Sequence, residues 1–230
     1  MFSWGKQANK EPEWAYEDLP SPETTQDMMK VIEDEKHTRL AWINGIDGWS
    51  HFANHEGIDI DQLQLPNSPI HVVRAVGVLK NVDVHKMFES FANGGLEERQ
   101  KVSPDILQHE VIEKVNGDET TYLSYSRFKT PMGISNRDFL TLRSQLHLDD
   151  GSTLIVSQSV NSKKKPFDSA TVRGVTRNAR LFEPISDTEC KVTLVDHVDP
   201  KGHVPAFVIN LFKKKAAEAI VKLQNIYGPQ

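Results

Sequence analysis

The feature that most constrains this chain is a series of short segments in which apolar and polar side chains alternate. Such alternation predicts β-strands with one buried face and one polar face. Turn-forming sequences at 116–119, 149–152 and 186–189 separate several of the segments, which favours a meandering antiparallel sheet. The predicted strands cover residues 70–79, 110–115, 120–129, 137–146, 152–160, 170–185 and 191–198.

Segments with helical periodicity lie before, between and after these strands. We predict an amphipathic helix over 23–44, a short helix over 82–92, and a long amphipathic helix over 204–227 that starts near Pro205. The chain has no repeat and no low-complexity linker. The order of elements predicts an α+β fold, in which a curved antiparallel β-sheet wraps around a long C-terminal α-helix and leaves space for a ligand between them.

The composition limits the number of domains and the kinds of partner that the chain can have. The chain has 230 residues, of which 38% are hydrophobic, and a formal net charge of −5. This is enough for one large domain with a core, and the negative balance gives no reason to expect a nucleic-acid partner. Residues 1–22, rich in Pro, Glu and Lys, are expected to form a flexible arm with Trp4 and Trp14, and residues 23–230 a single domain.

The compartment is inferred from cysteine usage and hydropathy. The only cysteine, Cys190, cannot form an internal disulfide, and no long apolar run marks a signal peptide or a membrane span. We therefore expect a cytoplasmic protein that meets membranes only peripherally. A monomer is expected because no exposed apolar repeat is evident.

Three motifs follow one another along the chain. They are ISNRDFLTLR at 134–143, TLIVSQSV at 153–160 followed by VRG at 172–174, and VTLVDHVDPKGHVPAFVINLF at 192–212. In this order they resemble the START (StAR-related lipid transfer) domain family, and the resemblance extends from about Ile70 to Leu223. Its overall pattern is similar to that of the phosphatidylcholine-transfer-protein-like branch. The resemblance implies a helix-grip fold that encloses a hydrophobic tunnel.

The function implied by the resemblance is that of a non-enzymatic intracellular lipid-binding or lipid-transfer protein. One lipid, a phospholipid, a fatty acid or a sterol-like molecule, would lie in the tunnel, and the C-terminal helix would gate it. A lipid leaving a bilayer needs apolar cover worth about 0.8 kcal/mol per methylene, which a closed tunnel supplies. The expected partners are the lipid and, transiently, a membrane surface, and no cofactor is implied.

Strand phase selects the first candidate ligand contacts. If Phe139 points inward, alternation places Thr141 and Arg143 on the same face. The resemblance implies that Arg143 is a buried arginine that contacts the polar end of the lipid; the alternative is an ion pair with a protein carboxylate. Both predict burial, because an uncompensated internal cation is costly. The preceding strand is expected to present Tyr122, Ser124, Ser126 and Phe128 on one face.

A later strand and the C-terminal helix supply further candidates. Arg173, Val175 and Arg177 are expected to share a face, and an arginine pair near Arg143 would favour an anionic head group; alternatively, Arg177 points to water. The helix residues expected to line the tunnel, or simply to pack against the sheet, are Val208, Asn210, Leu211 and Phe212.

At some positions this sequence departs from the pattern of the family. Phosphatidylcholine carriers have an aromatic residue at the position of Ser124, and sterol-binding members tend to have an acid there, so the resemblance supports neither ligand specifically. The arginine and aspartate that such carriers place in the preceding helix have no clear match in residues 96–107.

Membrane contact is predicted at two loops. Lys163, Lys164 and Lys165 could attract anionic lipids, at about 1 kcal/mol per charge near a surface, or could form an ordinary solvated face. Met132 and Ile134 lie in a loop between strands, where insertion of apolar side chains into a bilayer is plausible.

Enzymatic and metal-binding alternatives have weaker support. His51 and His55 could share a helical face, but no third metal ligand follows at suitable spacing, and no nucleophile-elbow, P-loop or dinucleotide-binding motif is present. The inward-facing Ser, Thr, Phe and Val content is not expected to supply a catalytic constellation. The remaining alternatives are a helix-grip enzyme of the cyclase or dehydratase type, and a lipid-responsive interaction module with the arm as its contact.

Overall fold

The computed structural model describes residues 19–66, 68–117, 120–131, 133–202, 204 and 206–229. Within these residues the chain forms a single ten-stranded sheet, in which β8 pairs with β6 beside the main path. The strand order along that path is β1-β2-β3-β10-β9-β7-β6-β5-β4. The strands are β1 (Trp49–His55), β2 (Ile58–Leu63), β3 (Val72–Lys80), β4 (Ile106–Lys114), β5 (Thr121–Phe128), β6 (Arg137–His147), β7 (Thr153–Ser159), β8 (Val172–Arg173), β9 (Val175–Ser186) and β10 (Glu189–Asp199).

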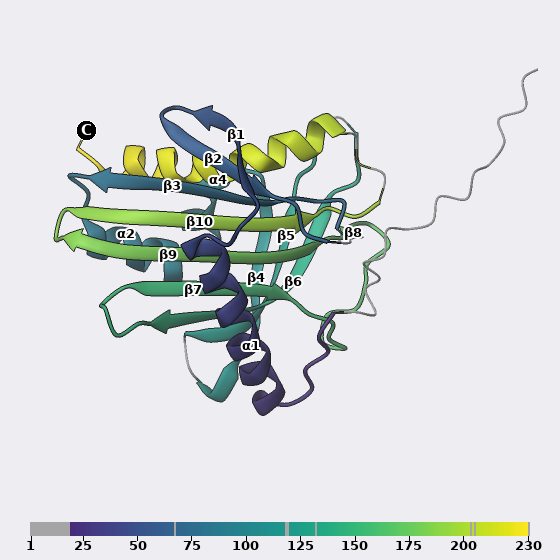
Figure 1. Ribbon diagram of the computed structural model, residues 1–230. Helices are drawn as coiled ribbons and strands as arrows, with labels where there is room; N and C mark the ends of the chain where they lie inside the picture. The colour runs from purple at the N-terminus through teal and green to yellow at the C-terminus, as the bar shows by residue number, and fades with distance from the viewer. Residues whose placement is uncertain are drawn as a thin grey trace, which may run out of the picture.

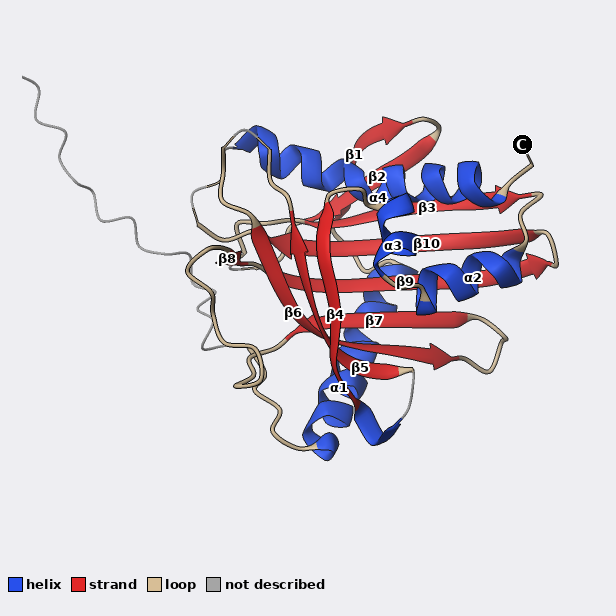
Figure 2. Cartoon of the chain, turned by 180° about the vertical axis from the view of Figure 1, so that it is seen from behind, coloured by secondary structure: helices blue, strands red, loops and turns tan. Residues whose placement is uncertain are grey.

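The helices cover both faces of this strongly curved sheet (Figure 1). They are α1 (Thr25–Asn44), α2 (Val84–Asn93), α3 (Leu96–Val102) and α4 (Ala206–Tyr227). In Figure 2, β4, β5 and β6 run steeply across the direction of β3, β10 and β9, and the helices α2, α3 and α4 lie on the inner side of the bend. The predicted α+β helix-grip fold is confirmed.

The helix α1 covers the outer face of the sheet. It begins with a capping box, in which the Thr24 hydroxyl accepts from the Asp27 backbone N–H while the Asp27 carboxylate accepts from Thr24. Further along, Trp42 and Ile43 pack into a hydrophobic cluster with Leu154 of β7. The predicted helix over 23–44 therefore serves as the outer layer of the domain.

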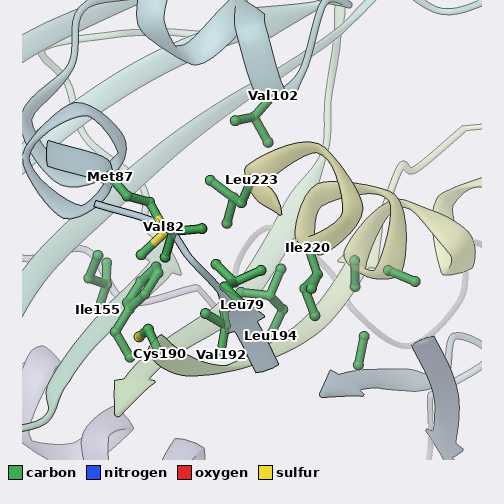
Figure 3. Packing of buried hydrophobic residues seen from close by; sticks show 14 of the residues in the cluster. Leu79, Val82, Met87, Val102, Ile155, Cys190, Val192, Leu194, Ile220 and Leu223 are labelled. Atoms are coloured by element: carbon green, nitrogen blue, oxygen red, sulfur yellow. The ribbon is translucent and has the colours of Figure 1, made fainter. Parts of the chain in front are cut away.

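The main core lies between α4 and the inner face of β3 and β10. Figure 3 shows Ile220 and Leu223 of α4 beside Leu79, Val192 and Leu194 of the sheet, all of them buried. Gly77 on β3 permits this approach, because a Cβ atom there would lie 2.6 Å from Ile220 Cγ2. The amphipathic pattern of the C-terminal segment thus anchors the helix on one half of the sheet.

One hairpin and one short helix are absent from the sequence prediction. Residues 49–63 form the β1–β2 hairpin, so the helical face suggested for His51 and His55 is wrong. A register break between His51 and Ala53 interrupts the alternation that would have marked β1 as a strand. The short helix α3, over 96–102, was also not predicted.

The predicted arm lies mostly outside the described residues, since these begin at Leu19. Leu19 is buried, and the carbonyl group of Pro20 accepts a hydrogen bond of 2.8 Å from the Asn161 backbone N–H. The last residues before α1 are therefore attached to the domain.

Replacing Gly77 tests the packing of α4 on the sheet. Gly77→Ala should lower the free energy of unfolding by about 1 to 3 kcal/mol, because the new methyl group overpacks the contact with Ile220. Gly95→Ala is the matched control, since a Cβ atom at Gly95 meets nothing within 4 Å. Urea unfolding measures both, and equal stabilities for the two variants would contradict this account of the packing.

Candidate functional site

A cavity of about 270 Å³ lies between the inner face of the sheet and the helices α3 and α4. Strands from both halves of the curved sheet contribute to its wall. The lining residues that the structure describes are Glu98, Arg99, Val102, Ser103, Ile106, His109, Ser124, Ser126, Phe128, Lys129, Thr130, Arg137, Phe139, Thr141, Arg143, Ser157, Thr176, Asn178, Arg180, Asp196, Val198, Phe212, Lys215, Ala219 and Tyr227.

The register of β5 and β6 builds one side of the wall. Ser124 lies opposite Thr141 and Ser126 opposite Phe139, so these side chains share the inner face. Phe128 and Arg143 also line the cavity, as their strand phase predicts. Tyr122 lies opposite Arg143 but is not among the lining residues. The contact of these residues with a lipid stays a prediction.

Phe139, in the first of the three motifs and on β6, is held by close packing. Its ring contacts Phe128 edge to face, with 5.6 Å between the ring centroids. A Cβ atom at Gly174 would lie 2.4 Å from Phe139 Cε1. The glycine between β8 and β9 is therefore required by the approach of this aromatic ring.

Arg143 reaches the cavity without a carboxylate partner among the described residues. Its Nη2 atom is buried and makes no hydrogen bond. Burial lowers the pKa of the guanidinium to about 10, with additional repulsion from Arg99 and Arg180. The alternative of an ion pair with a protein carboxylate, left open by the sequence, is therefore not realised in the described part of the chain.

The cavity is more polar than the sequence predicted. Arg99 on α3 donates to the Tyr122 hydroxyl at 3.2 Å, and His109 Nδ1 on β4 lies 2.9 Å from the Ser126 Oγ. Burial, followed by repulsion from Arg99 and Arg143, lowers the pKa of His109 to about 4. The cavity wall thus carries titratable side chains beside the Ser, Thr, Phe and Val content that the strands predicted.

An ion pair lies on the opposite side of the same wall. Arg180 Nη2 of β9 is 2.6 Å from the Asp196 carboxylate of β10, and Asn178 lines the cavity next to them. Alternation along β10 places Asp196 and His197 on opposite faces, and this signal could have identified Asp196 as a residue of the cavity wall. His197 indeed lies on the outer side, 3.2 Å from Ser68 Oγ.

The expected positions of three candidates on the later strand are wrong. Thr176, Asn178 and Arg180 face the cavity, so the intervening Val175 and Arg177 face outward toward α1. Arg173 belongs to the separate strand β8, where it forms a buried ion pair with Asp138 at 2.8 Å. Asp138 lies on the outer face, between the inward-facing Arg137 and Phe139, so Arg173, Val175 and Arg177 do share a face, but it is the outer face and not the one that lines the cavity.

On α4, one of the four predicted residues lines the cavity. Phe212 does so, whereas Val208 is buried without being part of the described wall. Asn210 is exposed, so its predicted place in the tunnel is wrong. The side chain of Leu211 lies outside the described structure.

The predicted membrane-contact loop carries paired lysines. Lys163, Lys164 and Lys165 lie within 3.2 Å of carboxylates of Glu23, Glu113 and Glu110, respectively. These pairs reduce the positive charge that the loop offers to an anionic surface. In the other loop, Ile134 is half-buried, and Met132 lies outside the described residues.

Neither a metal site nor a membrane-spanning helix is found among the described residues. No group of three or more His, Cys, Asp or Glu side chains in the described structure could hold a metal ion. No helix in it has the length and apolarity needed to cross a bilayer.

Comparison with known proteins places the chain in a family. The family profile described as START domain matches residues 45–225. START domain-containing protein 10 from Mus musculus is 30% identical over 118 residues, which are 50% of this chain and 39% of that protein. Rho GTPase-activating protein 7 from Homo sapiens is 23% identical over 185 residues, or 80% of this chain and 12% of that protein. The chain thus spans less than half the length of these relatives.

Solved structures share the fold. Human StAR-related lipid transfer protein 5 aligns with a TM-score of 0.78 and 20% identity, covering 88% of this chain and 97% of that one. The human StarD13 (DLC2) lipid transfer and protein localization domain aligns with a TM-score of 0.68 and 21% identity, covering 87% and 97%. The chain belongs to the START domain family.

The lowered pKa of His109 predicts a pH dependence of stability. Between about pH 6.5 and pH 4, the unfolded chain binds a proton at this position that the folded protein excludes. The free energy of unfolding should therefore fall as the pH falls through that window. His109→Gln should reduce the slope by roughly one proton, as measured by urea unfolding at pH 7 and pH 5. His37→Gln, at an exposed position on α1, is the control, and an unchanged slope in His109→Gln would contradict the prediction.

Proposed function

We propose that this protein is a non-enzymatic lipid-binding and lipid-transfer protein that holds one lipid in the cavity under α4. The supporting observation is an internal cavity in a START domain whose wall combines apolar side chains with a buried, unpaired guanidinium. The apolar part includes Val102, Ile106, Phe139 and Phe212, which supply cover for an acyl chain or a ring system. The polar part gives the ligand a fixed orientation.

A catalytic alternative receives limited support from one contact. A serine and a histidine 2.9 Å apart, as in Ser126 and His109, resemble a nucleophile with its general base. However, no described carboxylate pairs with the imidazole to orient it, and a pKa of about 4 makes it a weak base at neutral pH. The pair therefore suits hydrogen bonding to a polar head group better than acyl transfer.

The proposed gate is the helix α4 together with α3. Lys222 Nζ donates to the Val102 carbonyl oxygen at 2.9 Å, and Lys215 forms an ion pair with Asp105. These contacts fasten α4 to the segment between α3 and β4, over the cavity. Since polar contacts at a partly exposed seam are weak, movement here is a low-cost route for a lipid to enter.

The cellular setting of the proposal follows from the expected chemistry. We propose a monomer that works in the cytoplasm and exchanges its lipid during transient contact with a membrane surface. Membrane insertion at Met132 and Ile134, a mobile arm over residues 1–22, and the likeness to the phosphatidylcholine-transfer-protein-like branch remain predictions.

Filling the cavity tests lipid binding. Thr141→Trp should weaken binding of any lipid by about tenfold or more, because an indole that displaces even two methylenes removes about 1.6 kcal/mol of burial. Val76→Trp is the control, since Val76 is exposed on the other face of the sheet. Native mass spectrometry of protein purified from a eukaryotic lysate measures the bound lipid, and equal lipid occupancy in both variants would contradict the proposed site.

Cross-linking tests the gate. In an Asp105→Cys/Lys215→Cys double variant, a bismaleimide that joins the two thiols should slow lipid transfer between vesicles while the bound lipid is retained. Cys190 should not react, because it is buried and its thiol pKa is raised to about 11 by burial. The same variant treated with a monofunctional maleimide is the control, and equal transfer rates would rule out movement at this seam.

A further inference from the structure

Two partly or fully buried guanidinium groups of the cavity wall have neither a carboxylate nor a backbone carbonyl partner in the described part of the chain. Arg143 projects from β6, and its buried Nη2 atom makes no hydrogen bond. Arg99 projects from α3, donates only to the neutral Tyr122 hydroxyl, and has a buried Nε atom without a partner. Both guanidinium groups line the same cavity, and Arg99 donates to the hydroxyl of Tyr122, which lies opposite Arg143 in the register of β5 and β6.

The other cations of the wall are compensated. Arg180 and Lys215 each form an ion pair with a carboxylate. Arg137 donates to backbone carbonyl groups of the turn before α4, and Lys129 is exposed to solvent. The missing negative charge is therefore specific to the region of Arg99 and Arg143.

A buried arginine on the other face shows what this fold does when the role is structural. Arg39 of α1 is fully buried, and its Nη2 atom lies 2.6 Å from the Glu35 carboxylate and donates to Gln158 at 2.9 Å. The outer layer thus supplies an acid for its buried cation, while the described cavity wall supplies none for Arg143. A ligand can supply it instead.

We propose that the ligand is a single-chain lipid with an anionic head group, above all a phosphate monoester, which Arg99 and Arg143 bind. This rests on the proposed function, because it specifies the lipid held in the same cavity. A phosphate monoester carries close to two negative charges at neutral pH and so matches two guanidinium groups, which bind its oxygens bidentately. A carboxylate matches one. The cavity volume of about 270 Å³ lies just below the usual range for ligand pockets, so a lipid with one acyl chain requires less widening of the cavity than a lipid with two.

His109 and its partner complete the polar surroundings of this position. The imidazole is neutral at pH 7 and hydrogen-bonded to Ser126, so it adds a polar contact but no third charge. The acids of the described wall are Glu98 and Asp196, and both are paired, Glu98 with Lys101 and Asp196 with Arg180. Neither therefore competes freely for the two arginines.

The test compares lipids that share one oleoyl chain and differ in the head group. The probes are oleoyl lysophosphatidate, oleate, oleoyl lysophosphatidylcholine and monooleoylglycerol, each radiolabelled and used below its micelle concentration with the full chain at pH 7.4. We expect lysophosphatidate to bind most tightly, oleate next, and the zwitterionic and uncharged lipids at least about tenfold more weakly than lysophosphatidate.

Two variants assign that preference to residues. Arg99→Gln and Arg143→Gln should each reduce the ratio of lysophosphatidate to monooleoylglycerol affinity by about tenfold, while affinity for monooleoylglycerol is kept. Arg127→Gln makes the same change on β5, at a position outside the described cavity wall, and should keep the full ratio. Because each cavity variant removes an uncompensated charge, neither should lower the thermal midpoint of the ligand-free protein, unlike a change at an arginine with a structural role.

The outcomes separate the two proposals. Equal affinity for all four lipids in the unmodified protein would overturn the anionic head group but leave the lipid-binding function intact. An unchanged ratio in both Gln variants would remove these arginines from the head-group site. If none of the four lipids binds, the proposed function is overturned as well.

Discussion

Covering the inner face of one curved sheet is the constraint on which the rest of this structure depends. A helix with its side chains is about 10 Å across, whereas the strands of the sheet, spaced about 4.8 Å apart, extend over a much wider surface. The helix α4 covers β3 and β10 through its small and apolar residues and leaves the region of β4, β5 and β6 uncovered by core packing. The cavity occupies that region, closed from the side by α3. The cavity is thus a consequence of how much of the sheet one helix can cover.

Buried arginines on the two faces of the sheet differ in whether they have a carboxylate partner. On the outer face, Arg39 and Arg173 have carboxylate partners within the fold, Glu35 and Asp138. On the inner face, Arg143 has no such partner in the described structure and pays the cost of desolvation, which its lowered pKa of about 10 reflects. Costly local arrangements cluster at functional sites in proteins, and under the proposed function a lipid head group that neutralises the charge would remove this cost on binding.

Polar and apolar residues of the cavity come from elements that are distant in sequence. His109 reaches the site from β4, whose pairing with β5 contains register shifts between Ile106 and Gln108 and between Val111 and Glu113. Arg99 comes from a single short helix that is not amphipathic enough in sequence to stand out. The polar side chains of the cavity therefore come together only in the assembled sheet and helices. No single strand shows them in its sequence.

The sequence by itself determined the fold class, the order of most of the helices and strands, and the phase of β5 and β6. These follow from local alternation, helical periodicity and turn chemistry, and from the anchor that Phe139 gives to one face. Tertiary structure alone decided which arginines surround the cavity. The pairing of β9 with β7 and β10 put Arg177 on the outer face and Arg180 on the inner one, and the packing of α3 brought Arg99 to the same cavity as Arg143. The physical reason is that alternation tells which residues of a strand share a face but not which face points inward, and that contacts between distant elements depend on packing rather than on local pattern.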